Sequence, residues 1–443
     1  MTYQLRHGII NLSLIGLAFP LSASAGGFSI NENSAADLGR ANTGRVTSIH
    51  DASVAFGNPA LMVRFENLTI SNTVSYITGN VSFEDEGSVD LTGQSLGGDT
   101  DGFFDSAVVP ALQLVYPVSE RFAAGLSINA PFGLSSTYDE GWAGRYQGLG
   151  SELVTINVNP SVAFAVTDRF SIGGGFNVQY ANAELSSAID FGAVCFARLG
   201  LENCAPLGLT PQNADGSLEV EGDDISFGYN IGAAYSPSPS VTLGAHFRSR
   251  IRHNIEGDAD FTVPSNAQAL TATGAFTDSE GTARLPLPAT FEAGIAWKAS
   301  KNVSLYANIL HTNWSDLEEL RIDFDNPVQP DSVEELSFEN AVRFGVGADF
   351  EVSKDWTLRA GLSYDEGAAA EETRTVRIPD NDRYIYAIGA GYKGLKHWRF
   401  DLAFNRFQFK TTDFARVGPS ADFVIGELES DVDVFSIGGT RTF

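Results

Sequence analysis

The stretch ISFGYNIGAAY, residues 225–235, alternates between two kinds of side chain. One series is apolar or aromatic and consists of Ile225, Phe227, Tyr229, Ile231, Ala233 and Tyr235. The residues between them are small or polar. A period of two places successive side chains on opposite faces, so the stretch predicts a β-strand with one apolar face. A second face of Ser, Gly and Asn is unusual in the core of a soluble sheet.

The same alternation returns from residue 66 to the last residue. About fourteen such segments can be counted, at approximately 66–83, 106–118, 121–138, 150–167, 169–187, 223–236, 240–262, 284–299, 301–324, 337–352, 355–373, 383–394, 397–414 and 430–443. Lipid cannot hydrogen-bond backbone groups, so a sheet that spans a membrane must close on itself. Short and long connections alternate, as in bacterial outer-membrane barrels. The sequence therefore predicts an all-β fold, a 14-stranded antiparallel transmembrane β-barrel over residues 66–443.

A soluble secreted β-sandwich or propeller is the competing architecture. A propeller requires a repeat of constant period, and no such repeat is found. A polar lumen inside a bilayer explains the polar face of each strand better than a soluble core does.

Residues 1–25 have the pattern of an export signal. Arg6 precedes the apolar run Ile9–Leu17, which is too short to span a bilayer, and Ala23-Ser24-Ala25 fits the small-x-small cleavage rule. The mature chain is expected to begin at Gly26, with an uncleaved membrane anchor as the alternative. The export signal and the predicted barrel together predict a multi-pass protein of the Gram-negative outer membrane.

The C-terminal strand ends on an aromatic residue, Phe443. A terminal aromatic on an alternating strand resembles the sorting signal of outer-membrane barrels. Arg441 departs from that pattern, because an apolar residue is usual at its position. Near the membrane interface an arginine can place its charged group in water.

The composition excludes several classes of function. The formal net charge is −27, and it becomes −28 when the signal is removed, because Arg6 is the only charged residue lost. So acidic a chain is not expected to bind nucleic acid, which requires clustered Lys and Arg. The histidines show no metal-ligand spacing, and neither a nucleophile elbow nor a phosphate-binding loop is found. We expect no enzyme activity, no metal and no cofactor.

Cys195 and Cys204 are the two cysteines of the chain, and they lie in a turn-rich segment between predicted strands. In an exported protein two nearby cysteines most simply form one disulfide that closes a loop. A metal site is the alternative, but no histidine lies nearby to complete it.

Residues 26–65 differ from the rest of the chain. They contain small and polar residues, a short helical pattern around Ser34–Ala41 and the turn Asn58-Pro59-Ala60. A polar lumen can hold irregular backbone that lipid cannot. We therefore expect residues 26–65 to form a plug inside the barrel.

At the level of motifs, the chain resembles the FadL family of outer-membrane long-chain fatty acid transporters. The hatch segment and NPA motif of that family resemble GGFSINENSAADLGRANTG and DASVAFGNPALM. Further similar stretches, in the same order along the chain, are Pro131-Phe132-Gly133-Leu134, Thr155-Ile156-Asn157-Val158-Asn159, Phe247-Arg248-Ser249, Thr312-Asn313-Trp314-Ser315 and Ile378-Pro379-Asp380-Asn381-Asp382-Arg383-Tyr384.

The resemblance implies a monomeric barrel that passes hydrophobic molecules by diffusion. Ligand would be captured outside and would leave sideways through the wall at a kinked third strand. Pro131, Phe132 and Gly133 would form that kink, because Pro131 cannot donate a ladder hydrogen bond. By the same resemblance Asn58, Pro59 and Ala60 would contact the kink and couple the plug to the opening.

A fatty acid carboxylate would need a cationic anchor. Arg383 is the first candidate, because a guanidinium binds a carboxylate bidentately, and a salt bridge across the barrel is its alternative role. Phe28 and Ile30 are candidates to contact the ligand tail. An uptake channel for aromatic or other hydrocarbons, which needs no anchor, is the nearest rival function. An outer-membrane adhesin or enzyme that uses the long loops is a more distant one.

Overall fold

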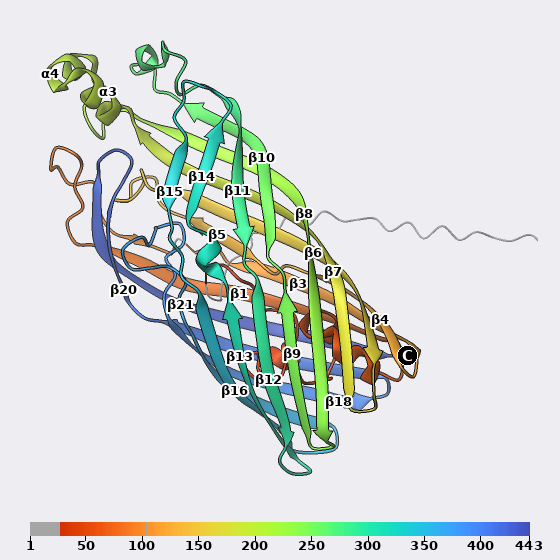
Figure 1. The fold of residues 1–443 in the computed structure, drawn as a ribbon. Coiled ribbons are helices and arrows are strands. Elements are labelled where there is room, and N and C mark those ends of the chain that lie inside the picture. Colours follow the sequence, from red (N-terminus) through yellow and green to blue (C-terminus); the bar gives the residue numbers. More distant parts are fainter. Residues whose placement is uncertain (1–26, 103) are drawn as a thin grey trace, which may run out of the picture.

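The computed structural model describes residues 27–102 and 104–443 (Figure 1). The expected signal, residues 1–25, and Gly26 lie outside the described residues. The described strands form one antiparallel sheet, and the first and last strands, β1 and β21, pair from Thr69↔Thr442 to Asp85↔Gly426. The sheet is therefore closed, and the predicted β-barrel is confirmed.

Within the described part of the chain the wall has fourteen strands, six of which are interrupted once. In chain order they are β1 (Thr69–Asp85); β3 (Ala107–Ser119); β4 (Phe122–Asn129) with β5 (Gly133–Thr137); β6 (Gly150–Ala165); β7 (Phe170–Asp190); β8 (Asp215–Ser238); β9 (Val241–Arg248) with β10 (Ile251–Thr262); β11 (Ser279–Leu287) with β12 (Thr290–Lys298); β13 (Val303–Thr312) with β14 (Glu319–Phe324); β15 (Ser332–Glu335) with β16 (Ala341–Glu351); β17 (Trp356–Asp365); β18 (Arg383–Leu395); β19 (Trp398–Phe409) with β20 (Thr412–Val417); and β21 (Phe423–Thr442).

The remaining elements are short. They are β2 (Thr100–Asp101), α1 (Ala35–Leu38), α2 (Val54–Gly57), η1 (Pro59–Arg64), α3 (Phe191–Leu199), α4 (Leu201–Cys204), η2 (Ala205–Leu207), η3 (Gln268–Thr271) and η4 (Trp314–Asp316). In the part of the chain that the structure describes, no helix has both the length and the apolar character needed to cross a membrane.

The polarity of the wall is inverted relative to a soluble protein. On β8 the side chains of Ile225, Phe227 and Ile231 are 56 to 59% exposed, whereas Asn230 is 1% exposed. The apolar series that the sequence placed on one face therefore points outward, and the polar series points into the barrel. This arrangement suits a lipid exterior and a polar, protein-filled interior.

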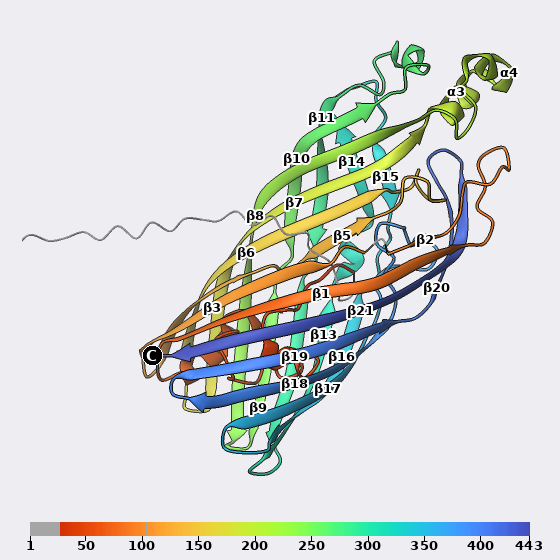
Figure 2. The ribbon, with the colours of Figure 1, turned by 180° about the vertical axis from the view of Figure 1, so that it is seen from behind.

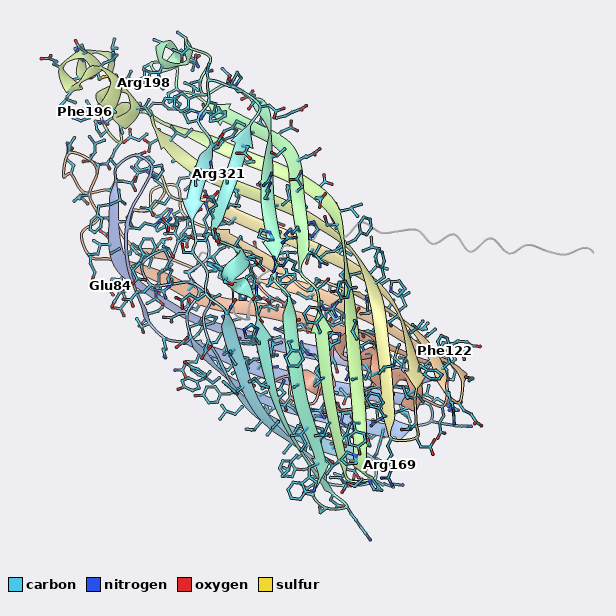
Figure 3. All side chains as sticks on the ribbon, in the orientation of Figure 1. Glu84, Phe122, Arg169, Phe196, Arg198 and Arg321 are labelled. Carbon is cyan, nitrogen blue, oxygen red and sulfur yellow. A yellow bond between two sulfur atoms is a disulfide. The ribbon has the colours of Figure 1, made fainter. Side chains whose placement is uncertain are left out.

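The two ends of the barrel differ in the length of their connections. Tight turns and the C-terminus lie at one end, and the long loops with α3 and α4 lie at the other (Figures 1 and 2). Figure 3 shows Phe122 and Arg169 at the turn end and Arg198 and Arg321 at the loop end. At the turn end Arg441 stacks on Phe443, with 4.4 Å between its guanidinium carbon and the ring centre.

The long β7–β8 loop carries α3 and α4 and is closed by a disulfide. Cys195 and Cys204 are bonded, with their Cα atoms 6.0 Å apart. Around them the loop has its own apolar core, which includes Phe191, Leu209 and Leu270. The loop is therefore packed against the neighbouring β10–β11 connection.

The N-terminal segment, residues 27–65, lies within the ring of strands (Figure 2, red). Its η1 contacts β6, β7 and β8, and its α1 contacts β18, β19 and β21 on another part of the wall. Glycines on the inner wall permit the close approach of its backbone. A Cβ atom added at Gly361 would lie 2.2 Å from the carbonyl carbon of Arg40, so a larger residue would displace the segment there.

Candidate ligand-transport site

The third wall strand is broken. β4 ends at Asn129 and β5 begins at Gly133, and Pro131 between them has no N–H to give to a ladder. β3 pairs with β4 only from Leu112 onward, and on the described ladders residues 107–111 pair with β1 alone. The hydrogen bonding of the wall is therefore interrupted between β3 and the break.

The interruption is bounded by a strand pairing on the loop side and by another on the turn side. On the loop side Phe104 and Ser136 form an isolated bridge, and on the turn side Leu112 pairs with Ile128. The neighbouring outer-face residues Leu112 and Ile156 are 46% and 47% exposed and belong to the apolar band. The break therefore faces the part of the wall that suits lipid.

The N-terminal segment takes the place of β3 at the break. The backbone N–H of Ile30 donates to the carbonyl of Pro131 at 2.8 Å, and the N–H of Gly133 donates to the carbonyl of Phe28 at 3.0 Å. Ser29 and Phe132 thereby form an antiparallel bridge. Backbone groups that the broken strand leaves unpaired are satisfied from inside the barrel.

Aromatic side chains extend this closure inward. The ring centres of Phe28 and Trp314 are 4.8 Å apart, and the Phe132 ring lies 6.2 Å from Phe28 and 6.1 Å from Trp314. All three are buried, and the contacts are edge-to-face, a favoured geometry for aromatic pairs. Phe28 borders an apolar pocket, and Ser29 and Ile30 border a polar cavity. Residues 28–30 therefore separate the two spaces.

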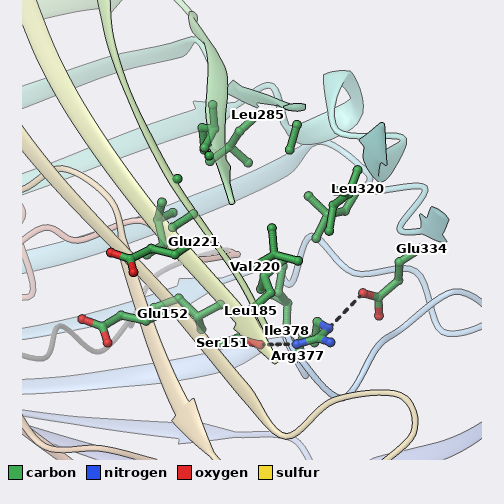
Figure 4. A pocket seen from close by; sticks show the side chains of 18 of the residues that line it. Ser151, Glu152, Leu185, Val220, Glu221, Leu285, Leu320, Glu334, Arg377 and Ile378 are labelled. Carbon is green, nitrogen blue, oxygen red and sulfur yellow. Dashed lines mark hydrogen bonds and ion pairs between the residues drawn. The ribbon is translucent and has the colours of Figure 1, made fainter. Parts of the chain in front are cut away.

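The apolar pocket lies on the loop side of Phe28 and is shown in Figure 4. Its walls come from β6, β7, β8, β10, β11 and β14. Its apolar lining includes Leu153, Leu185, Val220, Ile255, Leu285 and Leu320. A concave apolar space with a few polar groups is the usual form of a small-molecule site.

The charged groups at this pocket do not offer a free cation. Arg377 lies 3.3 Å from a Glu334 carboxylate oxygen and donates to the Ser151 hydroxyl and to the Gly150 carbonyl (Figure 4). The carboxylates of Glu152 and Glu221 point away from the apolar side chains in the same view. The pocket is therefore suited to an apolar tail.

The polar cavity lies on the other side of residues 28–30, next to Pro131 and Phe132. Its charged and titratable lining consists of Arg45, His246, Arg248, Glu292, Arg343 and Asp365. Three guanidinium groups thus meet two carboxylates beside the wall break.

Arg383 is not the free anchor that we expected. Its Nε and Nη2 atoms donate to the same Asp365 oxygen at 3.1 and 3.0 Å, and its Nη1 donates to Asp380 at 2.8 Å. The residue is 1% exposed and lies over the Phe409 ring. It forms an internal salt bridge, but between neighbours and not across the barrel, because Asp365 lies opposite Arg383 on the β17–β18 ladder and Asp380 is three residues before it.

Asp380 also holds the start of the N-terminal segment. Its Oδ2 accepts from the backbone N–H of Gly27 at 2.8 Å and of Ala368 at 2.6 Å. Burial raises the pKa of this carboxyl above its ordinary value, although the charge of Arg383 opposes the shift. The loop that carries Asp380 therefore anchors Gly27 above the break.

The neighbouring Asp382 has the opposite shift. Burial alone would raise its pKa, but hydrogen bonds from the Lys410 ammonium and the Tyr364 hydroxyl, both at 2.7 Å, hold the pKa below its ordinary value. These bonds fasten the end of the loop of residues 366–382 to β17 and to the β19–β20 turn.

Asn58 contacts a different part of the wall from the one we expected. Its amide nitrogen donates to the carbonyls of Val46 at 2.9 Å and of Ala233 at 3.1 Å, and Ala60 is tied by its carbonyl to the Ser171 hydroxyl at 2.7 Å. The turn that includes Pro59 therefore lies against β7 and β8, and the contact with the kink is made by Phe28–Ile30. The expected pairing was wrong because an Asn amide can donate to any nearby carbonyl.

Phe28 and Ile30, the candidates for contact with the ligand tail, have separate surroundings. Phe28 borders the apolar pocket, whereas Ile30 borders the polar cavity and packs with Val109, Ile385 and Phe407. Trp314, Thr155 and Arg343 also belong to the site and were not singled out from the sequence as site residues. The first two lie in stretches that resemble the family, but nothing in their spacing indicated a role.

Taken together, the closed barrel, the apolar outer band and the internal pocket define an outer-membrane transport protein. The sequence model of the family described as "Outer membrane protein transport protein (OMPP1/FadL/TodX)" matches residues 16–443. The chain belongs to this family.

Two relatives and one solved structure show the extent of the similarity. The 47 kDa outer membrane protein of Pasteurella multocida is 32% identical over 403 residues, which cover 90% of each chain. The long-chain fatty acid transport protein of Escherichia coli O6:H1 is 29% identical over 380 residues, which cover 84% of each chain. A crystal structure of a Pseudomonas aeruginosa FadL homologue superposes with a TM-score of 0.84 at 27% identity, covering 94% of this chain and all of that one.

Proposed function

We propose that this protein passes long-chain fatty acids, or similar hydrophobic molecules, through the outer membrane by diffusion. The single observation that carries the proposal is the position of residues 28–30, which close the wall break and separate it from the apolar pocket. The long-chain fatty acid transport protein of E. coli, whose sequence is similar over most of the chain, supports the choice of substrate.

In this proposal the N-terminal segment is the gate. Ligand enters from the loop end and fills the apolar pocket against Phe28. Displacement of residues 28–30 then joins the pocket to the break, and the molecule leaves sideways into lipid. The ligand tail crosses no water on this route, so no energy source is needed beyond its concentration gradient. One chain contains the complete route, which favours a monomer.

A reversible crosslink tests the gate. Ser29 and Phe132 form a bridge whose hydrogen bonds flank the pair, a geometry in which the two Cα atoms lie near enough for a disulfide. We expect the Ser29→Cys/Phe132→Cys variant to take up oleate at less than roughly a tenth of the wild-type rate when oxidised, and to recover on reduction, in cells that lack their own transporter.

Two controls accompany the crosslink. Each single cysteine variant should transport at the same rate with and without oxidant, and the wild type should be assayed with reductant, because reductant also breaks the Cys195–Cys204 bond. Undiminished oleate uptake by the fully crosslinked protein would show that residues 28–30 are not the gate.

An uptake channel for aromatic or other hydrocarbons is the second candidate. It is favoured by one observation, namely that Arg377, the arginine that lines the apolar pocket, is engaged by Glu334, and that Arg383, the expected anchor, is engaged by Asp365 and Asp380. Uptake of radiolabelled oleate and toluene by the same cells separates the two. Faster uptake of toluene than of oleate, abolished by the crosslink, would assign the protein to hydrocarbons.

A further inference from the structure

The polar cavity beside the wall break contains a buried guanidinium with unused donors. Arg343 on β16 is 2% exposed, and its Nε and Nη2 atoms have no hydrogen-bond partner among the described residues. Buried polar groups are normally paired, so two unpartnered donors on one buried cation indicate a missing acceptor.

The carboxylate opposite Arg343 on the neighbouring strand is shared with another arginine. Asp365 lies directly opposite Arg343 on the β16–β17 ladder, and its Oδ2 atom already accepts two hydrogen bonds from Arg383. Arg383 itself needs both Asp365 and Asp380. Asp365 therefore cannot satisfy the whole fork of Arg343.

A second arginine in the same cavity bonds only to uncharged acceptors in the described contacts. Arg248 donates to the Asn177 side chain at 2.7 Å and to the Phe56 carbonyl at 3.0 Å. Its guanidinium carbon lies 3.8 Å from the centre of the Phe56 ring. This arrangement fixes the planar group in position and leaves its charge uncompensated by a direct ion pair.

The other charged groups that face the cavity do not remove this excess. Glu292 accepts from Nε of Arg45 at 2.9 Å and from the Asn308 amide at 2.6 Å, so it is committed to that pair. His246 is hydrogen-bonded to Asn230. The cavity therefore has a local excess of positive charge next to the break.

The N-terminal segment supplies one further carboxylate. Glu32 is 1% exposed, its Oε2 atom accepts from the backbone N–H of Asn31, and its Oε1 atom is buried without a partner among the described residues. Burial raises the pKa of Glu32 to about 7, and the positive charges of Arg343 and Arg45 oppose that shift and favour the ionised form. Because Glu32 belongs to the segment, its carboxylate would leave the arginines when the segment moves.

We propose that Arg248 and Arg343 form an anion-binding site, which receives the carboxylate head group of an amphiphile as residues 28–32 leave the wall break. Glu32 compensates the arginines in the closed state, and the ligand carboxylate replaces it in the open state. The tail then lies toward the break, and the head stays paired until the tail has entered lipid. The inference rests on the proposed lateral route, and it assigns the head group to this cavity and not to the apolar pocket.

The test compares two ligands that differ only in the head group, oleate and oleyl alcohol. In cells that lack their own transporter, we expect the wild type to take up oleate faster than oleyl alcohol. Arg343→Met keeps the side-chain volume and removes the charge, and it should lower oleate uptake roughly tenfold while oleyl alcohol uptake is unchanged. Arg377→Met is the matched control at the apolar pocket and should leave the ratio of the two rates as it is.

Three outcomes would overturn the site. They are an unchanged ratio in Arg343→Met, an equal fall for both ligands, and loss of the preference in Arg377→Met instead. Should Arg343→Met fail to fold, Glu32→Gln decides the matter, because removal of the internal competitor should raise oleate uptake severalfold and leave oleyl alcohol unchanged. No change in Glu32→Gln would count against the site.

Failure of the route can be told apart from failure of the site. If the wild type takes up neither ligand, the proposed transport is wrong, and the site is then tested by binding to purified protein in a non-ionic detergent. Tighter binding of oleate than of oleyl alcohol, equalised by Arg343→Met, would still support the site. Equal binding of both ligands by the wild type would overturn it.

Discussion

The hydroxyl of Thr155 pairs with both backbone polar groups of Phe132. Its oxygen accepts from the Phe132 N–H at 3.0 Å, and the hydroxyl donates to the Phe132 carbonyl at 2.5 Å. Thr155 lies on β6, the strand that pairs with β4 before the break and with β5 after it. One side chain thus pairs both backbone groups of Phe132, which lies between the β4–β6 and β5–β6 ladders, and it fixes the broken strand in the shape that the N-terminal segment pairs with.

Replacement of Thr155 by Val should therefore loosen the break. The substitution keeps the shape of the side chain but leaves two buried backbone groups unpaired, at a cost of about 1–3 kcal/mol for each. We expect amide hydrogen exchange at Phe132 and Gly133 to accelerate at least roughly tenfold, which corresponds to about 1.4 kcal/mol. Thr155→Ser is the matched control and should exchange like the wild type. Equal rates in the two variants would contradict the role of the hydroxyl.

Loss of Arg383 should destabilise the first residues of the N-terminal segment, beginning at Gly27. In Arg383→Met two buried carboxylates, Asp365 and Asp380, lose the guanidinium that joins them, and breaking a buried pair in this way costs about 3–5 kcal/mol. Because Asp380 also holds Gly27, we expect faster proteolysis of the N-terminus together with a lower melting temperature. The Arg383→Met/Asp365→Asn double variant should regain part of the loss. A single variant as stable as the wild type would show that the pairs contribute nothing.

The disulfide should stabilise its loop and not the barrel. Closing a loop of this size contributes about 2–3 kcal/mol to the structure that it closes. In Cys195→Ser/Cys204→Ser we expect faster tryptic cleavage after Arg198, which is exposed on α3, and an unchanged melting temperature of the barrel. A barrel that melts earlier in the variant would mean that the loop core supports the wall.

Acid should release one end of the loop of residues 366–382. The pKa of Asp382 is held below its ordinary value, so the ionised form favours the folded loop. This contribution is present above the unfolded pKa of about 3.9 and is lost as the pH falls through the lower, folded pKa. We expect hydrogen exchange at Gly367, whose N–H donates to Asp382, to rise below about pH 4 relative to other loop amides. In Asp382→Asn this pH dependence should be absent, and its persistence would assign it to another group.

The architecture could be predicted because lipid acts on every wall strand in the same way. Ile225, Phe227 and Ile231 lie at alternating positions because each must face lipid. The same alternation recurs in fourteen strands, so a single sequence is enough to detect it. The break at Pro131 could also be predicted, because proline has no N–H to donate to a ladder and therefore interrupts a strand.

The partners at the site could not be predicted in the same way. The segment that closes the break does so through the backbones of Phe28 and Ile30, and backbone hydrogen bonds leave no trace in side-chain identity. Arg383 could have bound a ligand or the chain itself, and so acidic a protein offers many carboxylates to one guanidinium. Whether the donors of Arg343 have a partner depends on how Asp365 is shared with Arg383. That sharing can be known only from the three-dimensional structure.

The hydrogen bonds of the N-terminal segment are unevenly distributed along it. Its first residues are held by Asp380 and by the backbone at the break, whereas later residues are fixed by Arg40 to Asp349, by Arg45 to Glu292 and by Asn58 to Ala233. On the proposed route only the first few residues need to move for the break to open, and the remainder would stay fixed across the lumen. Passage of a ligand by this proposed route would leave the barrel electrically sealed, and the membrane would keep its resistance to ions while it admits a hydrophobic molecule.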